Sequence, residues 1–183
     1  MRAIDFAFMA LLVAMRPVYG NDFECVFDSK GLGSLNIGDP ESKIRDVFAT
    51  GYGITERSGG IAQRQVEVRK SLSNEKLYSF SLSNDGRVVL IDVFSACKNA
   101  DGIGTGSRLG DASKKYGKAS LEATDAGYFV VYNTIPTVGF KLENKDLPQK
   151  LRNLPDDSIS TKTERSILAT SNARFSQIRI YPE

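Results

Sequence analysis

The sequence predicts an α+β fold made of two pseudo-repeats, each a short helix followed by antiparallel strands, so that the sheet is mainly antiparallel. Two observations lead to this prediction. The cysteines Cys25 and Cys97 and the steps Gly38-Asp39 and Gly110-Asp111 recur at one offset of 72 residues. After each Gly-Asp step the spacing of apolar residues changes from helical to alternating, which is the pattern of a helix followed by strands.

Residues 1–20 are typical of a secretory signal peptide. The ten residues Phe6–Met15 are all apolar, and Val18 and Gly20 are small enough for a signal peptidase site. This apolar run is too short for a permanent membrane span. We therefore expect a mature chain that starts at Asn21, is periplasmic or secreted, and has no stable membrane insertion. The alternative is a cytosolic protein with an apolar first helix.

The compartment decides how the two cysteines are interpreted. Outside the cytoplasm, Cys25 and Cys97 have only each other as partners within the chain, so we expect a disulfide. Closing so long a loop stabilises a fold by roughly 4 kcal/mol in the chain-entropy model. In a cytosolic protein the same two residues are buried free thiols.

The first predicted unit spans residues 21–98 and begins with a short helix. Asp39 is expected to cap this helix, because its carboxylate can accept from the free amides of the first turn. Pro40 suits the first helical position. Alternating or continuous apolar residues then predict strands at residues 65–69, 77–82 and 87–94.

The second predicted unit spans residues 99–183. Asp111 is expected to cap a helix over residues 112–116, and an insertion at residues 143–173 interrupts the strands. The insertion is predicted to hold a short helix followed by a polar run over residues 156–166. Long insertions in compact domains are more often functional or mobile than structural. Strands are predicted at residues 128–132, 138–142 and 175–181.

Each unit resembles a module that is common in secreted bacterial proteins. The tandem arrangement is similar to that of the β-lactamase inhibitor proteins, and a single unit is similar to the small lipoproteins of outer-membrane barrel assembly. These families usually carry Gly-Met-Thr where this chain has Gly38-Asp39-Pro40 and Gly110-Asp111-Ala112. The resemblance implies a protein-binding periplasmic module, and in the inhibitor a concave sheet face grips the target enzyme.

The composition excludes several kinds of chemistry. The chain has no histidine and only two cysteines, which excludes Ser-His-Asp and Cys-His catalysis and the usual zinc sites. A net charge of +2 argues against nucleic acid or an anionic membrane surface as a partner. We therefore expect no cofactor, no metal site and no catalytic residues.

Three further patterns have ordinary structural explanations. The glycine-rich stretch Gly102–Gly110 lacks the ending of a phosphate-binding loop, so we interpret it as a tight turn before a helix, although an anion can sit at that helix start near Arg108. Ser73 and Lys76 have the spacing of a serine–lysine pair but fall in a turn between strands. Asp92 interrupts an apolar strand, and we expect it at a wet end of the sheet or paired with a lysine or arginine.

The sequence therefore predicts a non-enzymatic protein that binds a protein partner, as an inhibitor or immunity protein against a secreted hydrolase or toxin. The expected contact surface is the exposed sheet face or the insertion. The first alternative is an envelope assembly or scaffold protein, and the second is a hydrolase that uses two carboxylates. The candidate contact residues are strand tyrosines and charged residues of the insertion: Tyr128, Tyr132, Asp156, Asp157, Lys162 and Arg165.

Overall fold

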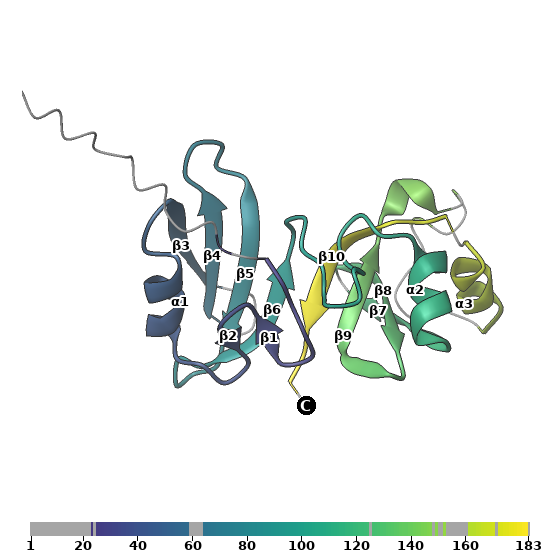
Figure 1. Cartoon of the computed structure of the whole chain (residues 1–183), viewed down its shortest axis with the longest axis horizontal. Coiled ribbons are helices and arrows are strands. Elements are labelled where there is room, and N and C mark those ends of the chain that lie inside the picture. Colours follow the sequence, from purple (N-terminus) through teal and green to yellow (C-terminus); the bar gives the residue numbers. More distant parts are fainter. Residues whose placement is uncertain are drawn as a thin grey trace, which may run out of the picture.

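The structure is a computed structural model. It describes residues 23, 25–58, 64–124, 126–147, 149, 152, 161–170 and 172–182. The predicted signal peptide over residues 1–20 lies outside these residues. Figure 1 shows a sheet that runs across the molecule, with one helix at one end and two at the other.

Most of the described chain is strand. The helices are α1 (Glu41–Val47), α2 (Leu109–Tyr116) and α3 (Thr161–Leu168), with one 3-10 turn, η1 (Asn144–Asp146). The strands are β1 (Gly31–Leu32), β2 (Leu35–Asn36), β3 (Tyr52–Ser58), β4 (Arg64–Lys70), β5 (Lys76–Leu82), β6 (Val88–Val93), β7 (Ala119–Thr124), β8 (Gly127–Tyr132), β9 (Ile135–Leu142) and β10 (Phe175–Ile180).

The large sheet is antiparallel and has the strand order β3-β4-β5-β6-β10-β9-β8-β7. Strands β3 to β6 follow one another along the chain, whereas β10, the last strand, lies between β6 and β9. At this central junction Val93 pairs with Ile178 and Ile91 with Ile180. Strands β1 and β2 form a separate two-stranded sheet.

The expected fold class, α+β with two helix-then-strands repeats, is wrong. The fold is mostly β, its helices are short, and its eight main strands form one continuous sheet. The physical reason lies in the pairing of β6 with β10, which joins residues about 87 positions apart. Local periodicity indicates that a segment is a strand but does not indicate which distant strand it pairs with.

Two strands were absent from the prediction, and both lie at the edges of the sheet. Strand β3 has four exposed residues at its end, and β7 alternates between exposed and half-buried residues without a large apolar run. The other six main strands coincide with predicted ones to within a few residues. Weak alternation at an edge strand is expected, because a neighbouring strand covers it on one side only.

One face of the sheet packs the hydrophobic core. The cross-strand register aligns one residue from each strand in a single row, which we call the inner row. Ile44 of α1 and Leu109, Ala112 and Tyr116 of α2 are buried in the same core. The inner row consists of Ile54, Val68, Tyr78, Val93, Ile178, Phe140, Val130 and Leu121.

The first helix begins one residue later than predicted, and Asp39 does not cap it. Pro40 is the N-cap residue of α1, and no side chain caps the helix. The carboxylate of Asp39 accepts instead from the backbone N–H of Asn36 at 2.7 Å and pairs with Lys43 at 2.7 Å. Asp39 therefore closes the turn before the helix, because that turn brings the Asn36 amide closer than the amides of the helix.

The second helix begins earlier than predicted, so Asp111 does not cap it either. Arg108 is the N-cap residue of α2, and Asp111 lies inside the first turn. Leu109 is fully buried, and its N–H donates to the carbonyl of Ala173 at 2.8 Å. This tertiary contact draws Leu109 into the helix. Gly117 ends the helix as expected, with a positive φ of 78°.

The region 143–173 also differs from its prediction. Helix α3 begins inside the stretch that was expected to be a polar run, and the turn η1 lies near the start of the region. Leu147 is buried, whereas Leu151 and Leu154 lie outside the described residues. Glu164 of α3 accepts from the backbone N–H of Leu121 at 3.1 Å. Helix α3 thus covers part of the edge strand β7, whose free N–H groups would otherwise face solvent.

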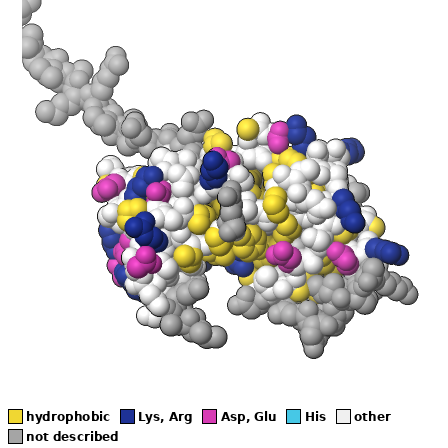
Figure 2. All heavy atoms as spheres, turned by 90° about the horizontal axis from the view of Figure 1, so that it is seen from below, with side chains coloured by type: hydrophobic (Ala, Val, Ile, Leu, Met, Phe, Trp, Pro, Cys, Tyr) yellow, Lys and Arg dark blue, Asp and Glu magenta, His cyan; other side chains and the backbone are white. Residues whose placement is uncertain are grey.

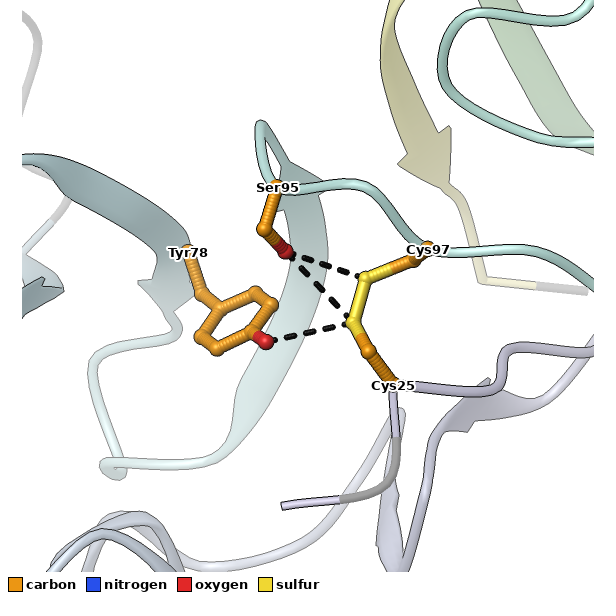
Figure 3. The surroundings of a disulfide bond; sticks show 4 residues. All are labelled: Cys25, Tyr78, Ser95 and Cys97. Atoms are coloured by element: carbon orange, nitrogen blue, oxygen red, sulfur yellow. Dashed lines mark hydrogen bonds between the residues drawn. A yellow bond between two sulfur atoms is a disulfide. The ribbon is translucent and has the colours of Figure 1, made fainter. Parts of the chain in front are cut away.

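Cys25 and Cys97 form the predicted disulfide, with their Cα atoms 4.9 Å apart. In Figure 3, Tyr78 and Ser95 surround the two sulfurs: the Tyr78 hydroxyl donates to Cys25 Sγ at 3.1 Å, and Ser95 Oγ lies 3.0 Å from Cys97 Sγ. Disulfides persist in oxidising compartments, so this bond fits a location outside the cytoplasm. None of the helices in the described ranges has the length and apolar character needed to span a bilayer.

Candidate functional site: the open sheet face

The sheet face opposite the core carries a second row of cross-strand neighbours, which we call the open-face row. Side chains alternate between the two faces of a strand, so the residues next to the inner row point away from the core. Among the described residues, all five buried polar or charged side chains lie on this face: Glu67, Ser79, Ser81, Asp92 and Gln177. The open-face row consists of Thr55, Glu67, Ser79, Asp92, Arg179, Gly139, Val131 and Ser120.

Glu67 is buried at one end of this row, with 2% of its surface exposed. Its carboxylate contacts three cations: Arg69 at 2.6 Å, Lys76 at 3.3 Å and Arg57 at 3.4 Å. Burial by itself raises the pKa of a carboxyl, but hydrogen bonds from Arg69 and Lys76 and the nearby charges leave the pKa of Glu67 below its ordinary value. Glu67 is therefore ionised at neutral pH.

Three cations around one carboxylate leave this cluster with a net positive charge. The Arg57 side chain is 63% exposed and the Lys76 side chain 32%. The Lys76 ammonium also lies 4.3 Å from the centroid of the Phe94 ring. These contacts explain why Ser73 and Lys76 do not form a serine–lysine pair, since the amine is held by Glu67 and Phe94.

Asp92 lies at the centre of the row and is 8% exposed. Its Oδ1 accepts from Arg179 Nε at 2.7 Å and from Gln177 Nε2 at 2.7 Å, and its Oδ2 accepts from Arg179 Nη2 at 3.1 Å. The expectation that Asp92 pairs with a lysine or arginine is confirmed. A two-point contact of this kind fixes the guanidinium in one orientation.

The rings of Phe129, which is fully buried, and Tyr181 pack beside the Asp92–Arg179 pair. The Arg179 guanidinium carbon is 4.6 Å from the centroid of the Phe129 ring. A Cβ added at Gly139 would come within 3.0 Å of Tyr181 Cε2 and 3.2 Å of Phe129 Cδ1. The absence of a side chain at Gly139 therefore lets both rings lie over β9. Burial, followed by the charge of Glu122, raises the pKa of Tyr181 to about 12, so its hydroxyl stays protonated.

Tyr181 also lines a pocket at the lower edge of the sheet, on the underside of the molecule. Two pockets of about 400 and 530 Å³ share Ser29 there, and Ile37, Ile135 and Pro182 line their walls. Figure 2 shows hydrophobic side chains gathered in the middle of this underside, with charged side chains toward both ends. An apolar centre with a charged rim is the usual anatomy of a protein–protein contact surface.

The strand tyrosines chosen from the sequence are not on this surface. Tyr128 is 5% exposed and Tyr132 is fully buried. Tyr132 packs against the rings of Tyr116 and Phe140 in the core. Tyr128 and Tyr132, taken as candidate contact residues, face the core, because the register turns Phe129 and Val131 to the open face instead.

The candidate residues of the insertion are placed only in part. Arg165 is exposed on α3. Asp156 and Asp157 lie outside the described residues, and so does the side chain of Lys162. The described residues contain no group of three or more His, Cys, Asp or Glu side chains that could hold a metal ion.

The geometry of the open face favours binding over proton transfer. A general acid needs a carboxyl whose pKa is raised toward neutrality. Glu67 has a lowered pKa, and both oxygens of Asp92 are occupied by Arg179 and Gln177.

Most residues of this surface were not singled out from the sequence. Alternation in Val66-Glu67-Val68 already turns Glu67 away from the core, so this residue was within reach of sequence reasoning. The partners of Asp92 could not be found from the sequence. Arg179 lies 87 residues away, and only the register of β6 with β10 brings it close to Asp92.

Comparison with known proteins yields one fold relationship. No protein-family model and no curated protein matches the chain. The crystal structure of the uncharacterized protein YfeY from Escherichia coli is similar to it, with a TM-score of 0.59 and 17% sequence identity over 86% of this chain and 99% of that chain. At this level of identity the similarity concerns the fold alone, and the chain shares its fold with YfeY.

Proposed function

We propose that this protein is a non-enzymatic binding protein that acts outside the cytoplasm, in the periplasm or after secretion. Its partner is a protein, in the first place a secreted hydrolase or toxin that it blocks as an inhibitor or immunity protein does. The contact surface is the open sheet face. The observation that carries the proposal is the open-face row, in which the buried carboxylate of Glu67 holds the partly exposed cations Arg57 and Lys76 in place.

Three features support binding rather than structure alone. Buried ion pairs contribute little net stability compared with apolar residues of the same size, so a row of them fits a recognition role better. Fixed side chains lose little entropy when a partner binds. The pockets lined by Ile37, Tyr181, Ile135 and Pro182 add a few apolar contacts beside the open face.

The location rests on the disulfide together with the signal-peptide pattern of residues 1–20.

The test is affinity capture from periplasmic extract and culture medium, with the oxidised chain as bait. A variant with Arg57→Glu and Lys76→Glu reverses two partly exposed charges of the open face. The matched control is Lys114→Glu, an exposed lysine on α2 on the core side of the sheet. Circular dichroism first establishes that all three proteins are folded.

The proposal predicts one protein captured by the wild type and by the Lys114 variant but lost with the open-face variant. The same protein, if it is a hydrolase or toxin, should lose activity when bound. Capture that is equal for all three baits, or no capture at all, would contradict the proposed function.

A further inference from the structure

A pocket of about 410 Å³ lies at the start of α2, and it is separate from the open face. Its walls come from the glycine-rich turn after Cys97, from the first turn of α2 and from the beginning of β10. Its charged lining residues are Lys98, Arg108, Asp111 and Arg174. Three cations and one carboxylate give the pocket a net charge of about +2, so it favours a dianion.

The three cations of this pocket have no carboxylate partner among the described residues. Arg174 Nη1 donates to the carbonyl of Gly106 at 2.8 Å, whereas Lys98 and Arg108 make no side-chain hydrogen bond or ion pair there. All three side chains belong to exposed residues and are free to meet a ligand. Elsewhere on the described surface, arginines commonly pair with carboxylates, as Arg45 and Arg64 do with Glu41.

The backbone holds two of these cations directly opposite each other. Arg108 and Arg174 form an antiparallel bridge. The N–H of Leu109 donates to Ala173 O at 2.8 Å, and the N–H of Phe175 donates to Ser107 O at 3.0 Å. These bonds flank the bridge, so Arg108 and Arg174 are a non-hydrogen-bonded pair, the kind in which side chains come closest.

Like charges at directly opposed positions destabilise a strand pair. The Asp146 carboxylate accepts from the backbone N–H of Arg174 at 2.9 Å and Asp111 lines the pocket, but no described carboxylate forms an ion pair with either guanidinium to offset the repulsion. An anion between the two guanidinium groups would remove it and would gain charge-assisted hydrogen bonds from both. The opposed arginines Arg108 and Arg174 therefore destabilise the strand pair when no ligand is bound, and they stabilise a bound anion.

The ligand would be held by side chains and not by the glycine-rich turn. The backbone amides of residues 102–107 all donate within the protein, for example Thr105 to Cys97 O at 3.1 Å and Gly106 to Phe175 O at 2.7 Å. This agrees with the interpretation of the stretch as a tight turn. Thr105 lines the same pocket, and its hydroxyl oxygen is buried without a hydrogen-bond partner in the described structure.

We propose that this pocket binds a phosphate dianion through Arg108, Arg174 and Lys98. The tetrahedral oxygens of phosphate match two opposed guanidinium groups and an ammonium. The phosphate can belong to a free phosphorylated molecule or to a phosphate-bearing lipid headgroup. The site is independent of the protein-binding role proposed for the open face.

The test is titration of the oxidised full chain with inorganic phosphate at about pH 8 and low ionic strength, followed by two-dimensional NMR and by thermal unfolding. The variant is Arg108→Gln, whose side chain makes no hydrogen bond or ion pair in the described structure. The control is Lys114→Gln, which removes an exposed lysine of the same helix outside the pocket lining. Without phosphate, the Arg108 variant should be at least as stable as the wild type, because a repulsion is removed.

We expect saturable shifts in the amides of residues 104–108 and a phosphate-dependent rise in Tm for the wild type and the control. Affinity should fall by about 10-fold or more in the Arg108 variant, because a charge-assisted hydrogen bond is lost. Shifts that do not saturate, or an equal loss of affinity in the control, would mean general charge screening and would overturn the proposal.

A second arm distinguishes the source of the phosphate. The same three proteins are sedimented with phosphatidylcholine vesicles that contain phosphatidic acid. Co-sedimentation that depends on Arg108 would support the site with a lipid headgroup as its ligand. Saturable phosphate binding without co-sedimentation would support it with a soluble ligand.

Discussion

The inner row and the open-face row run side by side through the same eight strands, yet different forces hold them. Every member of the inner row is apolar or a tyrosine, and its central members are almost fully buried. The open-face row has Glu67 on β4 and the neighbouring pair Asp92 and Arg179 on β6 and β10, with Ser79 of β5 between Glu67 and Asp92. Burial of apolar area stabilises the first row, whereas the second depends on each charge finding its partner.

The two rows differ in how they respond to substitution. Apolar side chains can pack against many different apolar neighbours, so several residue types can fill the inner row. A buried carboxylate is costly unless it is paired, so the open face accepts few substitutions. We therefore infer that the inner row holds the fold and that the open-face row is kept for binding.

The largest expected effect is in the inner row. Phe140 is fully buried and packs against the rings of Phe27, Tyr132 and Phe175. Phe140→Ala leaves a cavity and should lower the free energy of unfolding by about 4 kcal/mol. Urea denaturation measures it, with Leu72→Ala as a control that should change stability by less than about 0.5 kcal/mol, since Leu72 is 99% exposed. An equal loss of unfolding free energy in both variants would contradict the claim that burial in the inner row stabilises the fold.

The next effect is at the centre of the open-face row. Asp92→Asn leaves the Arg179 guanidinium, whose side chain is 15% exposed, without its carboxylate. We expect a loss of about 3 kcal/mol, because the charge of Arg179 stays largely buried. The double variant with Asp92→Asn and Arg179→Met should recover part of this loss in the same denaturation experiment. If the double variant is the less stable of the two, the pair is not coupled as described.

Glu67→Gln should have a smaller effect, about 1 to 2 kcal/mol at pH 7. The cations that it leaves unpaired, Arg57, Arg69 and Lys76, are partly exposed and can be hydrated by water. The variant should keep its fold and lose affinity for the partner, measured by the capture assay. If Glu67→Gln lowered the free energy of unfolding more than Asp92→Asn does, the exposure of the unpaired cations would not explain the difference between the two sites.

The effect of Glu67 should also depend on pH. Because the pKa of Glu67 is lowered on folding from an ordinary value of 4.5, its ionised form stabilises the fold above pH 4.5. This contribution is lost as pH falls through the lowered pKa of the folded state. The difference in unfolding free energy between the wild type and Glu67→Gln should therefore shrink below pH 4.5 and vanish in stronger acid. If the difference in unfolding free energy stayed constant with pH, the ionised form of Glu67 would not be what stabilises the fold.

The sequence predicted the inner row better than the open-face row, and the reason is physical. Alternation identifies Val66, Val68, Tyr78 and Phe80 as core residues, because it reflects burial of each strand on one face. The Cys25–Cys97 disulfide was predicted because the chain has only two cysteines and residues 1–20 indicate an oxidising compartment. The ends of the helices did not follow, because Leu109 joins α2 only through its contact with Ala173.

The open-face contacts depend on long-range register, which no local pattern contains. The charges of Glu67 and Asp92 are visible in the sequence, but their partners Arg57 and Arg179 are fixed by pairing between strands. The same register determines that Phe129 and not Tyr128 lies on the open face of β8, where Phe129 is fully buried. A shift of one residue would exchange the two faces of β8.

The central claim is that the open face is where the partner binds, and site-specific photo-cross-linking tests it most directly. A photoreactive amino acid replaces Arg57 on the open face in one protein and Lys114 on α2 in another, both at exposed positions. The oxidised proteins are irradiated in the compartment where the chain is found. The account predicts one discrete cross-linked protein from position 57 and none from position 114. The same adduct from both positions, or an adduct from position 114 alone, would contradict it.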